Sequence, residues 1–507
     1  MKKILNYIKN WLNNFNILNL ALIVIIMLRL FNSFVHLDND LWFILSTGKY
    51  VVHHWIPYYD PLTMHEGYVV IMQQWLTASI YYLIYTHLGL KIFSVVLSLL
   101  SIAGIYVLYR YSKYLTNNKN LSIILIIFFI YFFLGGYTTS RPQIITYLIL
   151  TSELFLCEKF YRTNNKKYLY ALPILSLLEI NMHASMWLLQ ICFVGTFLVN
   201  ALNNKKKFIP LLITIIAMCL TGLINPYGIR AITYVFSSYE VSVLNDYINE
   251  MKELPITSLS SLITFVSIVL MVFLNRNAKE QFPVRYAFLL FGCAYLAFSH
   301  IKSLPYLGIA LVVCFSYLLR DESIKNTYIK LVNKIKNIKL KKVLLFKPRL
   351  NFKIFKFGLG IICIFTLFAG YLTSLDSVEL VSAMEKSVDY MDEHVENKED
   401  ITVYTSYEDG GYLEWRGYKP YIDPRGDVFL KSTNKKYDLM DEYVKYTRNV
   451  NQISEFLEKY KFDYLVVNSK STMNKYLSSN KESETHYKEV ATSTDSYYKY
   501  ILYERVK

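Results

Sequence analysis

Charged residues are scarce in this chain of 507 residues. They make up 18% of the sequence, whereas hydrophobic residues make up 54% and the mean hydropathy is +0.26. A soluble protein with so few charges could not cover its own core. Apolar runs of about 18 residues recur along the first three quarters of the chain, which is typical of helices that cross a bilayer. The composition therefore predicts a polytopic membrane protein and excludes fibrous, disordered and disulfide-scaffold classes, and also a simple cytosolic enzyme.

Several catalytic and binding motifs are also lacking. The sequence has no Walker A motif, no H-E-x-x-H and no G-x-S-x-G, so ATP-driven transport, zinc proteolysis and lipase chemistry have no support. Its six cysteines fall in or beside apolar runs and none has zinc-ligand spacing, so we expect neither disulfides nor a cysteine metal site. The net charge of +15 comes from short loops between apolar runs, a pattern typical of cytoplasmic loops rather than of nucleic-acid binding.

The apolar runs predict a mainly α-helical membrane bundle over residues 1–374. Charged residues interrupt the runs and divide them into about eleven spans. The N-terminal run is long and has no small-residue cleavage site, so we interpret it as a retained first helix. The spans are expected near residues 17–35, 91–109, 121–138, 142–157, 168–181, 184–202, 208–224, 257–275, 283–299, 303–319 and 354–374.

Two apolar segments in the first external loop, residues 36–90, are left out of this count. Residues 41–55 carry apolar side chains at helical spacing, as in an interfacial amphipathic helix; these are Leu41, Leu45, Val52 and Trp55. Residues 69–89 are long enough to span a bilayer. We expect them to lie in the outer leaflet or to re-enter it, for a reason of charge.

That reason is the distribution of basic loops. If residues 69–89 do not span, the basic breaks near residues 110–119, 159–167, 205–207, 276–279 and 320–356 all face the cytoplasm. The N-terminus is then cytoplasmic and residues 375–507 are extracytoplasmic. In this last part the apolar runs shorten and charges return. Expected strands at 401–406, 463–468 and 497–505 alternate with helical patterns at 376–395 and 435–460, which predicts a soluble α/β domain.

The predicted topology gathers the polar residues of the membrane part on the outer face. Asp38 and Asp40 follow the first span. Two carboxylates one residue apart can bind a divalent cation such as Mg²⁺ or Mn²⁺, or accept a proton from a hydroxyl nucleophile; alternatively, Asp40 caps a helix and Asp38 is solvated. Arg141 lies between two closely spaced spans, where its planar donors suit a phosphate or anchor it at the headgroups.

The remaining candidates for substrate contact have equally plain alternatives. His183 can bind a ligand or close an interhelical hydrogen bond, and Lys302 with His300 can neutralise a leaving phosphate or anchor the chain. Asp60 lies in the first external loop. Glycine-containing turns at strand ends are expected in the soluble domain at 409–412 and 423–427, where Asp423 and Arg425 contact an acceptor or form a structural pair.

In this layout the sequence resembles the GT-C superfamily of integral membrane glycosyltransferases, and within it a large bacterial family of GT-C-like proteins. The resemblance runs over most of the chain. It departs at Gln74, where relatives often have an acidic residue, and at Ala184, where they have glycine. The matching stretches are Asp40-Leu41-Trp42, Thr47-Gly48, Ile56-Pro57, Asp60-Pro61, Trp75-Leu76, Arg141-Pro142-Gln143, Asn181-Met182-His183, Asn225-Pro226-Tyr227-Gly228, Gly410-Gly411-Tyr412 and Ile422-Asp423 with Arg425.

The resemblance implies an inverting glycosyltransferase in a bacterial cytoplasmic membrane. It would move a sugar from a polyprenyl-phosphate carrier to a hydroxyl of an extracytoplasmic glycan, lipid or protein, with Asp38 or Asp40 as general base and Arg141 on the phosphate. The alternative is a lipid-linked glycan transporter or an assembly scaffold without enzymatic activity. A transporter needs polar groups along a path through the bilayer, and the sequence indicates them at one face, which favours the enzyme.

Overall fold

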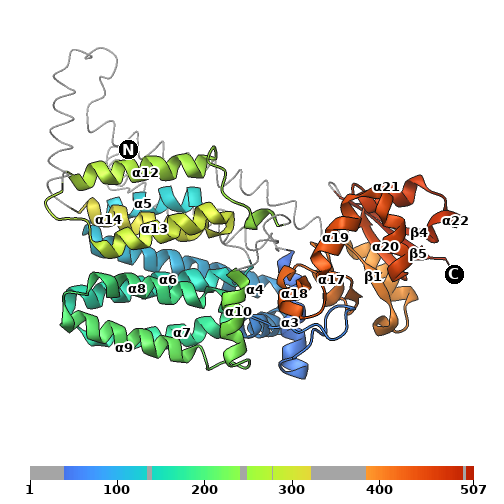
Figure 1. Ribbon diagram of the computed structural model, residues 1–507, viewed down its shortest axis with the longest axis horizontal. Coiled ribbons are helices and arrows are strands. Elements are labelled where there is room, and N and C mark those ends of the chain that lie inside the picture. The colour runs from blue at the N-terminus through green and yellow to red at the C-terminus, as the bar shows by residue number, and fades with distance from the viewer. Residues whose placement is uncertain are drawn as a thin grey trace, which may run out of the picture. The chain divides into compact units, whose positions relative to one another are not determined.

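The computed structural model describes residues 39–133, 140–239, 248–276, 278–320, 384–494 and 498–506 (Figure 1). The described part is mostly helical, with a small sheet near the C-terminus, as the sequence predicts. It divides into two compact units, which are described separately. Asp38 and the predicted spans at 17–35 and 354–374 lie outside the described residues.

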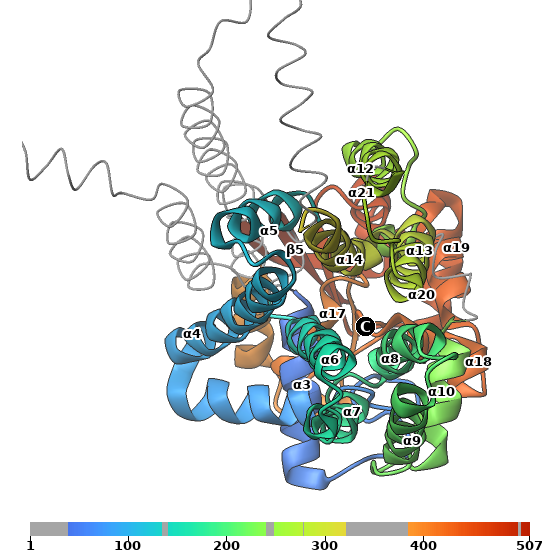
Figure 2. The ribbon, with the colours of Figure 1, turned by 90° about the vertical axis from the view of Figure 1, so that its left-hand side faces the viewer.

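The first unit comprises residues 102–133, 253–276 and 278–320. In it α14 lies between neighbouring helices, as Figure 2 shows, and its side chains are buried throughout. Ser112 and Ser316 share a hydrogen bond of 2.7 Å between their hydroxyl oxygens, so α14 is also tied to the end of α4. The helices are the end of α4 (Trp75–Thr116), α5 (Lys119–Phe133), α12 (Leu259–Arg276), α13 (Val284–Ser299) and α14 (Leu304–Leu318).

The second unit contains five further apolar or amphipathic helices. α7 packs against α6, α8 and α9, and the Trp187 indole N–H donates to Ser176 Oγ at 2.9 Å, which joins α8 to α7. The short helix α10 packs Val235 against Trp187. The bounds are α6 (Gln143–Thr163), α7 (Ala171–Met182), α8 (Trp187–Asn200), α9 (Lys205–Thr221) and α10 (Ile229–Tyr239).

Helix α4 is broken at Gly89, whose backbone angles (φ 78°, ψ 169°) are not helical. The break falls where the sequence separates segment 69–89 from the span at 91–109. Within the described residues, three helices are long and apolar enough to cross a membrane: Trp75–Thr116, Leu259–Arg276 and Ile301–Leu318. Others are apolar but shorter. The count of about eleven spans and the orientation of the termini stay predictions.

The C-terminal sheet has the strand order β2-β1-β3-β5-β4. β1 runs parallel to β2 and β3, whereas β5 is antiparallel to both β3 and β4. The three predicted strands are confirmed as β1, β3 and β5, but β4 was not predicted because its residues are polar and half exposed. The bounds are β1 (Thr402–Tyr404), β2 (Lys419–Pro420), β3 (Tyr464–Asn468), β4 (Tyr487–Thr494) and β5 (Lys499–Arg505).

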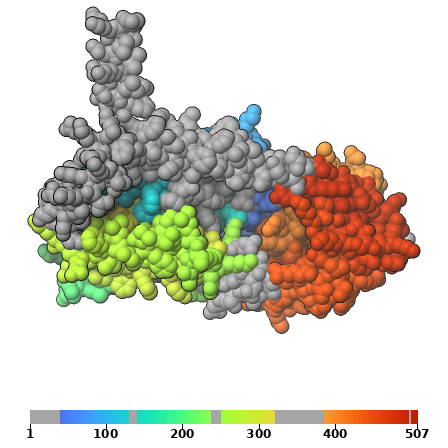
Figure 3. All heavy atoms as spheres, turned by 90° about the horizontal axis from the view of Figure 1, so that it is seen from above, coloured from blue at the N-terminus to red at the C-terminus, as the bar shows by residue number. Residues whose placement is uncertain are grey.

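Helices cover both faces of this sheet, and together they form the continuous surface in orange and red in Figure 3. Alternate strand residues point to opposite faces. Leu465 and Val467 pack with α19 (Leu439–Arg448) and α20 (Ile453–Tyr460), which confirm the helical pattern predicted at 435–460. Val466 packs on the other face, with residues of α3 (Asp40–His54) and α17 (Gly410–Trp415).

The first half of helix α3 is thus enclosed by protein. The helix predicted here is confirmed, and its placement at the membrane interface stays a prediction. Leu41 and Leu45 are 0% exposed because α17 and the sheet cover them, whereas Val52 and Trp55 at the far end are exposed. The ring of Trp42 packs edge-on against Tyr412 of α17, with centroids 5.3 Å apart. The start of α3 is therefore held in a fixed place.

Candidate active site

A pair of opposite charges lies at the start of α3. Arg141, in the loop before α6, approaches Asp40 with its Nη2 atom 3.0 Å from Oδ2. The Nη1 atom of Arg141 donates to Glu250 Oε2 at 2.6 Å. The three side chains are 21%, 24% and 40% exposed. The structure therefore joins two residues that the sequence singles out, and leaves both within reach of a solute.

This arrangement suits both proton acceptance and phosphate binding. Asp40 occupies the first turn of α3, where the helix dipole stabilises a negative charge. Arg141 presents two donors from a planar fork, and Glu250 shares that fork with Asp40. The sequence analysis missed Glu250, because nothing in the segment around it indicates contact with a loop so far away in the chain.

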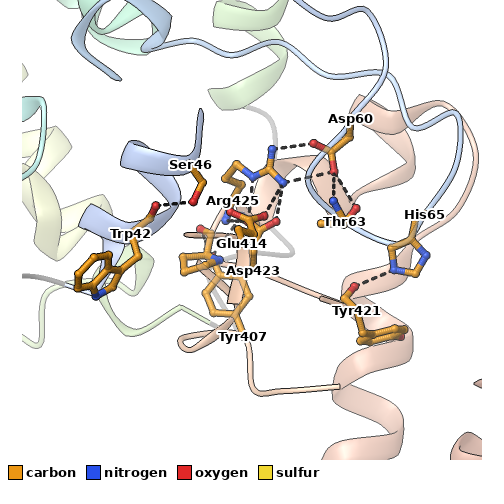
Figure 4. Close-up of polar contacts among 12 residues, drawn as sticks. Trp42, Ser46, Asp60, Thr63, His65, Tyr407, Glu414, Tyr421, Asp423 and Arg425 are labelled. Atoms are coloured by element: carbon orange, nitrogen blue, oxygen red, sulfur yellow. Dashed lines mark hydrogen bonds and ion pairs between the residues drawn. The ribbon is translucent and has the colours of Figure 1, made fainter. Parts of the chain in front are cut away.

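A second, buried cluster surrounds Arg425. Its guanidinium donates to Asp60 from Nη1 (2.7 Å), to Asp423 from Nη2 (2.6 Å) and Nε (3.0 Å), and to Glu414 from Nη2 (3.1 Å), as Figure 4 shows. The Arg425 side chain is 8% exposed and the three carboxyl groups are 0% exposed. Asp60 also accepts from the Thr63 hydroxyl at 2.7 Å. The cluster fastens the segment after α3 to the turn after β2.

The environment fixes the protonation of this cluster. Burial alone would raise the pKa of Asp60, but the charge and hydrogen bonds of Arg425 outweigh it and hold that pKa below its ordinary value. Burial and the neighbouring Asp423 charge raise the pKa of Glu414 well above its ordinary value. The opposing carboxylates keep the pKa of Arg425 above its ordinary value despite burial. The pKa of Asp60 is therefore lowered and that of Glu414 is raised, although both carboxyl groups contact the same guanidinium.

Tyr407 links the two clusters electrostatically. Its hydroxyl donates to the Pro424 carbonyl at 2.6 Å and accepts from the Gly426 N–H at 3.2 Å. Burial, together with the negative charges of Asp40 and Asp423, raises its pKa well above the ordinary value. Asp40 is therefore close enough to Tyr407 of the sheet domain for its charge to affect the pKa of that tyrosine.

Two glycines allow the sheet domain to approach α3. A Cβ atom on Gly411 would lie 2.8 Å from the Phe43 backbone nitrogen, and one on Gly410 would lie 2.0 Å from the Ile422 carbonyl oxygen. The prediction of a strand-end turn at 409–412 is therefore wrong. Gly410 begins helix α17, and the small residues serve its close packing against α3 and the end of β2.

His183 lies at the end of α7 and is buried. Its Nδ1 atom is 2.8 Å from the Thr146 hydroxyl of α6, which donates to Glu179 Oε1 at 2.6 Å. The backbone N–H of Ala184 donates to the Gln73 carbonyl at 2.9 Å. His183 thus forms an interhelical hydrogen bond, one of the two roles that the sequence allows.

His300 and Lys302 lie in the first unit, between α13 and α14, so their part in phosphate binding stays a prediction. In the described part of the chain no group of three or more His, Cys, Asp or Glu residues is arranged to hold a metal ion. A guanidinium lies between the carboxylates of Asp40 and Glu250, so these donors do not fit a divalent cation.

Comparisons with known proteins identify the fold. No family model matches the chain, and no curated protein sequence matches it. ArnT from Cupriavidus metallidurans bound to undecaprenyl phosphate aligns over 96% of this chain and 97% of its own, with 9% identity and a TM-score of 0.53. The apo oligosaccharyltransferase of Archaeoglobus fulgidus aligns over 89% and 69%, with 11% identity and a TM-score of 0.53.

A further structure of the archaeal enzyme, AglB in complex with an inhibitory peptide and a dolichol-phosphate, aligns over 88% of this chain and 69% of its own, with 10% identity and a TM-score of 0.52. ArnT and AglB are both GT-C glycosyltransferases, and the chain shares their fold, as its resemblance implies. At these identities the likeness is one of fold.

Proposed function

We propose that the chain is an inverting glycosyltransferase of the cytoplasmic membrane. It moves a sugar from a polyprenyl-phosphate donor to a hydroxyl of an extracytoplasmic glycan, lipid or protein. The observation that carries the proposal is the partly exposed ion pair of Asp40 and Arg141 at the start of α3. Its fold is shared with ArnT and AglB, whose structures hold undecaprenyl phosphate and dolichol-phosphate, which supports a lipid-phosphate donor.

In this proposal Asp40 is the general base. Its carboxylate accepts the proton of the acceptor hydroxyl while the hydroxyl oxygen forms a bond to the anomeric carbon. The bond between that carbon and the phosphate oxygen breaks on the opposite side, which inverts the configuration, and its electron pair remains on the phosphate. The helix dipole at the start of α3 favours the negative charge of Asp40.

In this proposal Arg141 stabilises the negative charge that develops on the phosphate. When no donor is bound, the guanidinium of Arg141 pairs with both Asp40 and Glu250. A phosphate that takes the Nη2 donor would replace Asp40 as the partner of that donor. Donor binding and activation of the base are therefore coupled through one guanidinium.

Asp60, Asp423 and Arg425 are predicted substrate contacts, and for Asp423 and Arg425 the sequence also allows a structural pair. The ion pairs of Arg425 with its carboxyl partners and the burial of the cluster favour the structural role. We assign them a positioning role. They hold the segment after α3 against the sheet domain, and α17 in turn supports α3 and Asp40.

No step of this mechanism uses a metal ion, because the described donors around Arg141 do not fit one. The predicted metal pair of Asp38 and Asp40 stays a prediction, since Asp38 lies outside the described residues.

A transfer assay tests the proposal. Purified protein in nanodiscs is given short-chain polyprenyl-phosphate sugars and an envelope-fraction acceptor. We expect Asp40→Asn to lower transfer by about a hundredfold or more, as for loss of a general base. Asp389→Asn is the matched control, because Asp389 also pairs with an arginine, Arg416, at 2.6 Å, but away from the site. Full activity in Asp40→Asn would exclude this base, whereas no transfer by the wild-type protein would favour the transporter or scaffold alternative.

A further inference from the structure

Ionisable side chains are buried inside the helices α6 and α7, where the sequence indicates only apolar spans. Glu153 and Glu158 of α6 and Glu179 of α7 are each 0% exposed, and so is Gln190 of α8. The sequence analysis places nearly all polar residues of the membrane part at one face, and these buried groups add a second location. An ionisable group inside an apolar helix is costly and is a functional-site candidate by default.

Three of these side chains converge. The helices α6, α7 and α8 pack against one another (Figure 2). Glu153 faces the Gln190 amide and lies within electrostatic reach of Glu179. Five buried polar atoms here have no partner in hydrogen-bonding geometry among the described residues: both carboxyl oxygens of Glu153, Oε2 of Glu179, and both amide atoms of Gln190.

Such a cluster is unfavourable as bare charge. A buried polar group without a partner costs about 1–3 kcal/mol, and an isolated buried carboxylate costs far more. Protons on the carboxyl groups remove the charges, and water between three polar side chains satisfies the remaining donors and acceptors. The composition of the cluster, two carboxyl groups and an amide, fits that occupancy.

A continuous row of hydrogen bonds leads from Glu179 to the end of α7. Thr146 donates to Glu179 Oε1 at 2.6 Å, and the same hydroxyl lies 2.8 Å from His183 Nδ1. A hydroxyl that donates to a carboxylate can at the same time accept from an imidazole N–H. Glu153 lies about two helical turns further along α6 than Thr146.

We propose that His183, Thr146, Glu179 and Glu153 form a proton relay, with a proton-binding site inside the membrane part of the protein. A protonated His183 gives its Nδ1 proton to the Thr146 oxygen as the Thr146 proton passes to Glu179. His183 is left neutral and Glu179 becomes a neutral acid, so one proton moves inward and charge balances. Water beside Gln190 continues the path to Glu153.

Two further ionisable groups of α6 lie beside this path, Cys157 and Glu158. Cys157 interacts electrostatically with both Glu153 and Glu158. Glu158 pairs with Arg162, with Oε1 and Nε 2.7 Å apart, so its charge is compensated near the opposite end of α6. Among the described residues no ion pair joins a cation to Glu153 or Glu179. In this proposal protons enter these two groups from the His183 end, where Ala184 contacts Gln73.

Infrared spectroscopy of the full-length protein in nanodiscs tests the relay. A protonated buried carboxyl group gives a C=O stretch band that shifts in D₂O at the rate at which its proton exchanges. We expect Glu179→Gln and Glu153→Gln each to remove part of this band. We expect Thr146→Val to slow the exchange by about tenfold or more, and Thr146→Ser, which restores the hydroxyl, to return the wild-type rate.

Thr151→Val is the matched control, because Thr151 is also a buried threonine of α6 but donates to the Tyr147 carbonyl at 2.6 Å, outside the row. Its exchange should equal that of the wild type. An unchanged rate in Thr146→Val, or equal slowing in Thr151→Val, would overturn the relay. Loss of the band when NaCl replaces the salt of a large organic cation at the same ionic strength would also overturn the relay. The carboxyl groups would then bind a metal cation and not protons. The test does not depend on glycosyl transfer.

Discussion

Asp60 and Arg425 are 365 residues apart in the chain and form a buried ion pair through two hydrogen bonds, at 2.7 and 3.3 Å. The pair joins the segment after α3 to the sheet domain. Asp423 and Glu414 complete the coordination of the guanidinium. The C-terminal part of the chain is therefore built into the surroundings of Asp40, and is not simply a module on a tether.

Removing the central cation should unfold this junction. Arg425→Met leaves the carboxylates of Asp60 and Asp423 buried without a cation, and we expect a loss of about 3–5 kcal/mol in the free energy of unfolding. The measurement is chemical unfolding in detergent micelles. Arg416→Met is the control: Arg416 also pairs with two aspartates, but these are 51% and 25% exposed, so its loss should cost less than about 1 kcal/mol. Equal effects would contradict the special role of Arg425.

Asp409 should make stability depend on pH. Burial raises its pKa from 3.8 to about 6, against the hydrogen bonds from Ser406 and Tyr500. Between these values the folded state holds a proton that the unfolded state has lost, so stability falls as pH rises from about 4 to about 6, by about 3 kcal/mol in all. Asp409→Asn should remove this slope.

The control for that experiment is Asp400→Asn, since Asp400 is exposed. Unfolding midpoints of the three proteins are compared across the pH range. A slope that persists in Asp409→Asn, or disappears in Asp400→Asn, would assign the dependence to another group.

Gly411 should tolerate no side chain. In Gly411→Ala the new Cβ would meet the Phe43 backbone nitrogen at 2.8 Å, so α17 and α3 must separate. We expect a loss of about 1–3 kcal/mol, as for other overpacked sites, together with lower transfer because α3 carries Asp40. Gly195→Ala is the matched control, since a Cβ there meets nothing within 4 Å. Thermal unfolding and the transfer assay read out both effects, and a Gly411→Ala protein as stable as Gly195→Ala would contradict the close packing.

The sequence predicted local structure better than contacts. The helix at 41–55 and the strands around Val403, Val466 and Leu502 follow from apolar side chains at the spacing of each structure. Sequence reasoning also placed Asp40 and Arg141 on one face, because basic loops fix the orientation of the spans. It could not pair Asp60 with Arg425, since an ion pair between distant segments leaves no periodic pattern.

The buried acids were missed for a different reason. Glu153 and Glu179 each interrupt an apolar run only once, and a hydropathy average over a span hides a single carboxyl group. Glu414 was not predicted because Gly410-Gly411 indicates a turn. These glycines instead begin helix α17, which presents Glu414 to Arg425.

Glu250 should compete with the donor for Arg141. Its carboxylate accepts from Nη1 at 2.6 Å, so Glu250→Gln frees one donor of the guanidinium for a phosphate. An exposed ion pair is worth about 0.2–1 kcal/mol, so we expect up to about fivefold tighter donor binding. Glu253→Gln, a change of an exposed carboxylate nearby in the sequence, should have no effect. Weaker binding in Glu250→Gln would show instead that Glu250 holds Arg141 in place for the phosphate.

The central claim is that Arg141 binds the phosphate of a lipid-linked donor. Its most direct test is equilibrium binding of short-chain polyprenyl-phosphate sugars to the protein in nanodiscs, wild type against Arg141→Ala, with Arg110→Ala as control because Arg110 is exposed and donates to Tyr106 of its own helix. We predict saturable binding that Arg141→Ala weakens by about tenfold or more (about 1.4 kcal/mol), and that Arg110→Ala leaves unchanged. Equal binding by wild type and Arg141→Ala, or no binding to any sugar headgroup, would contradict the account.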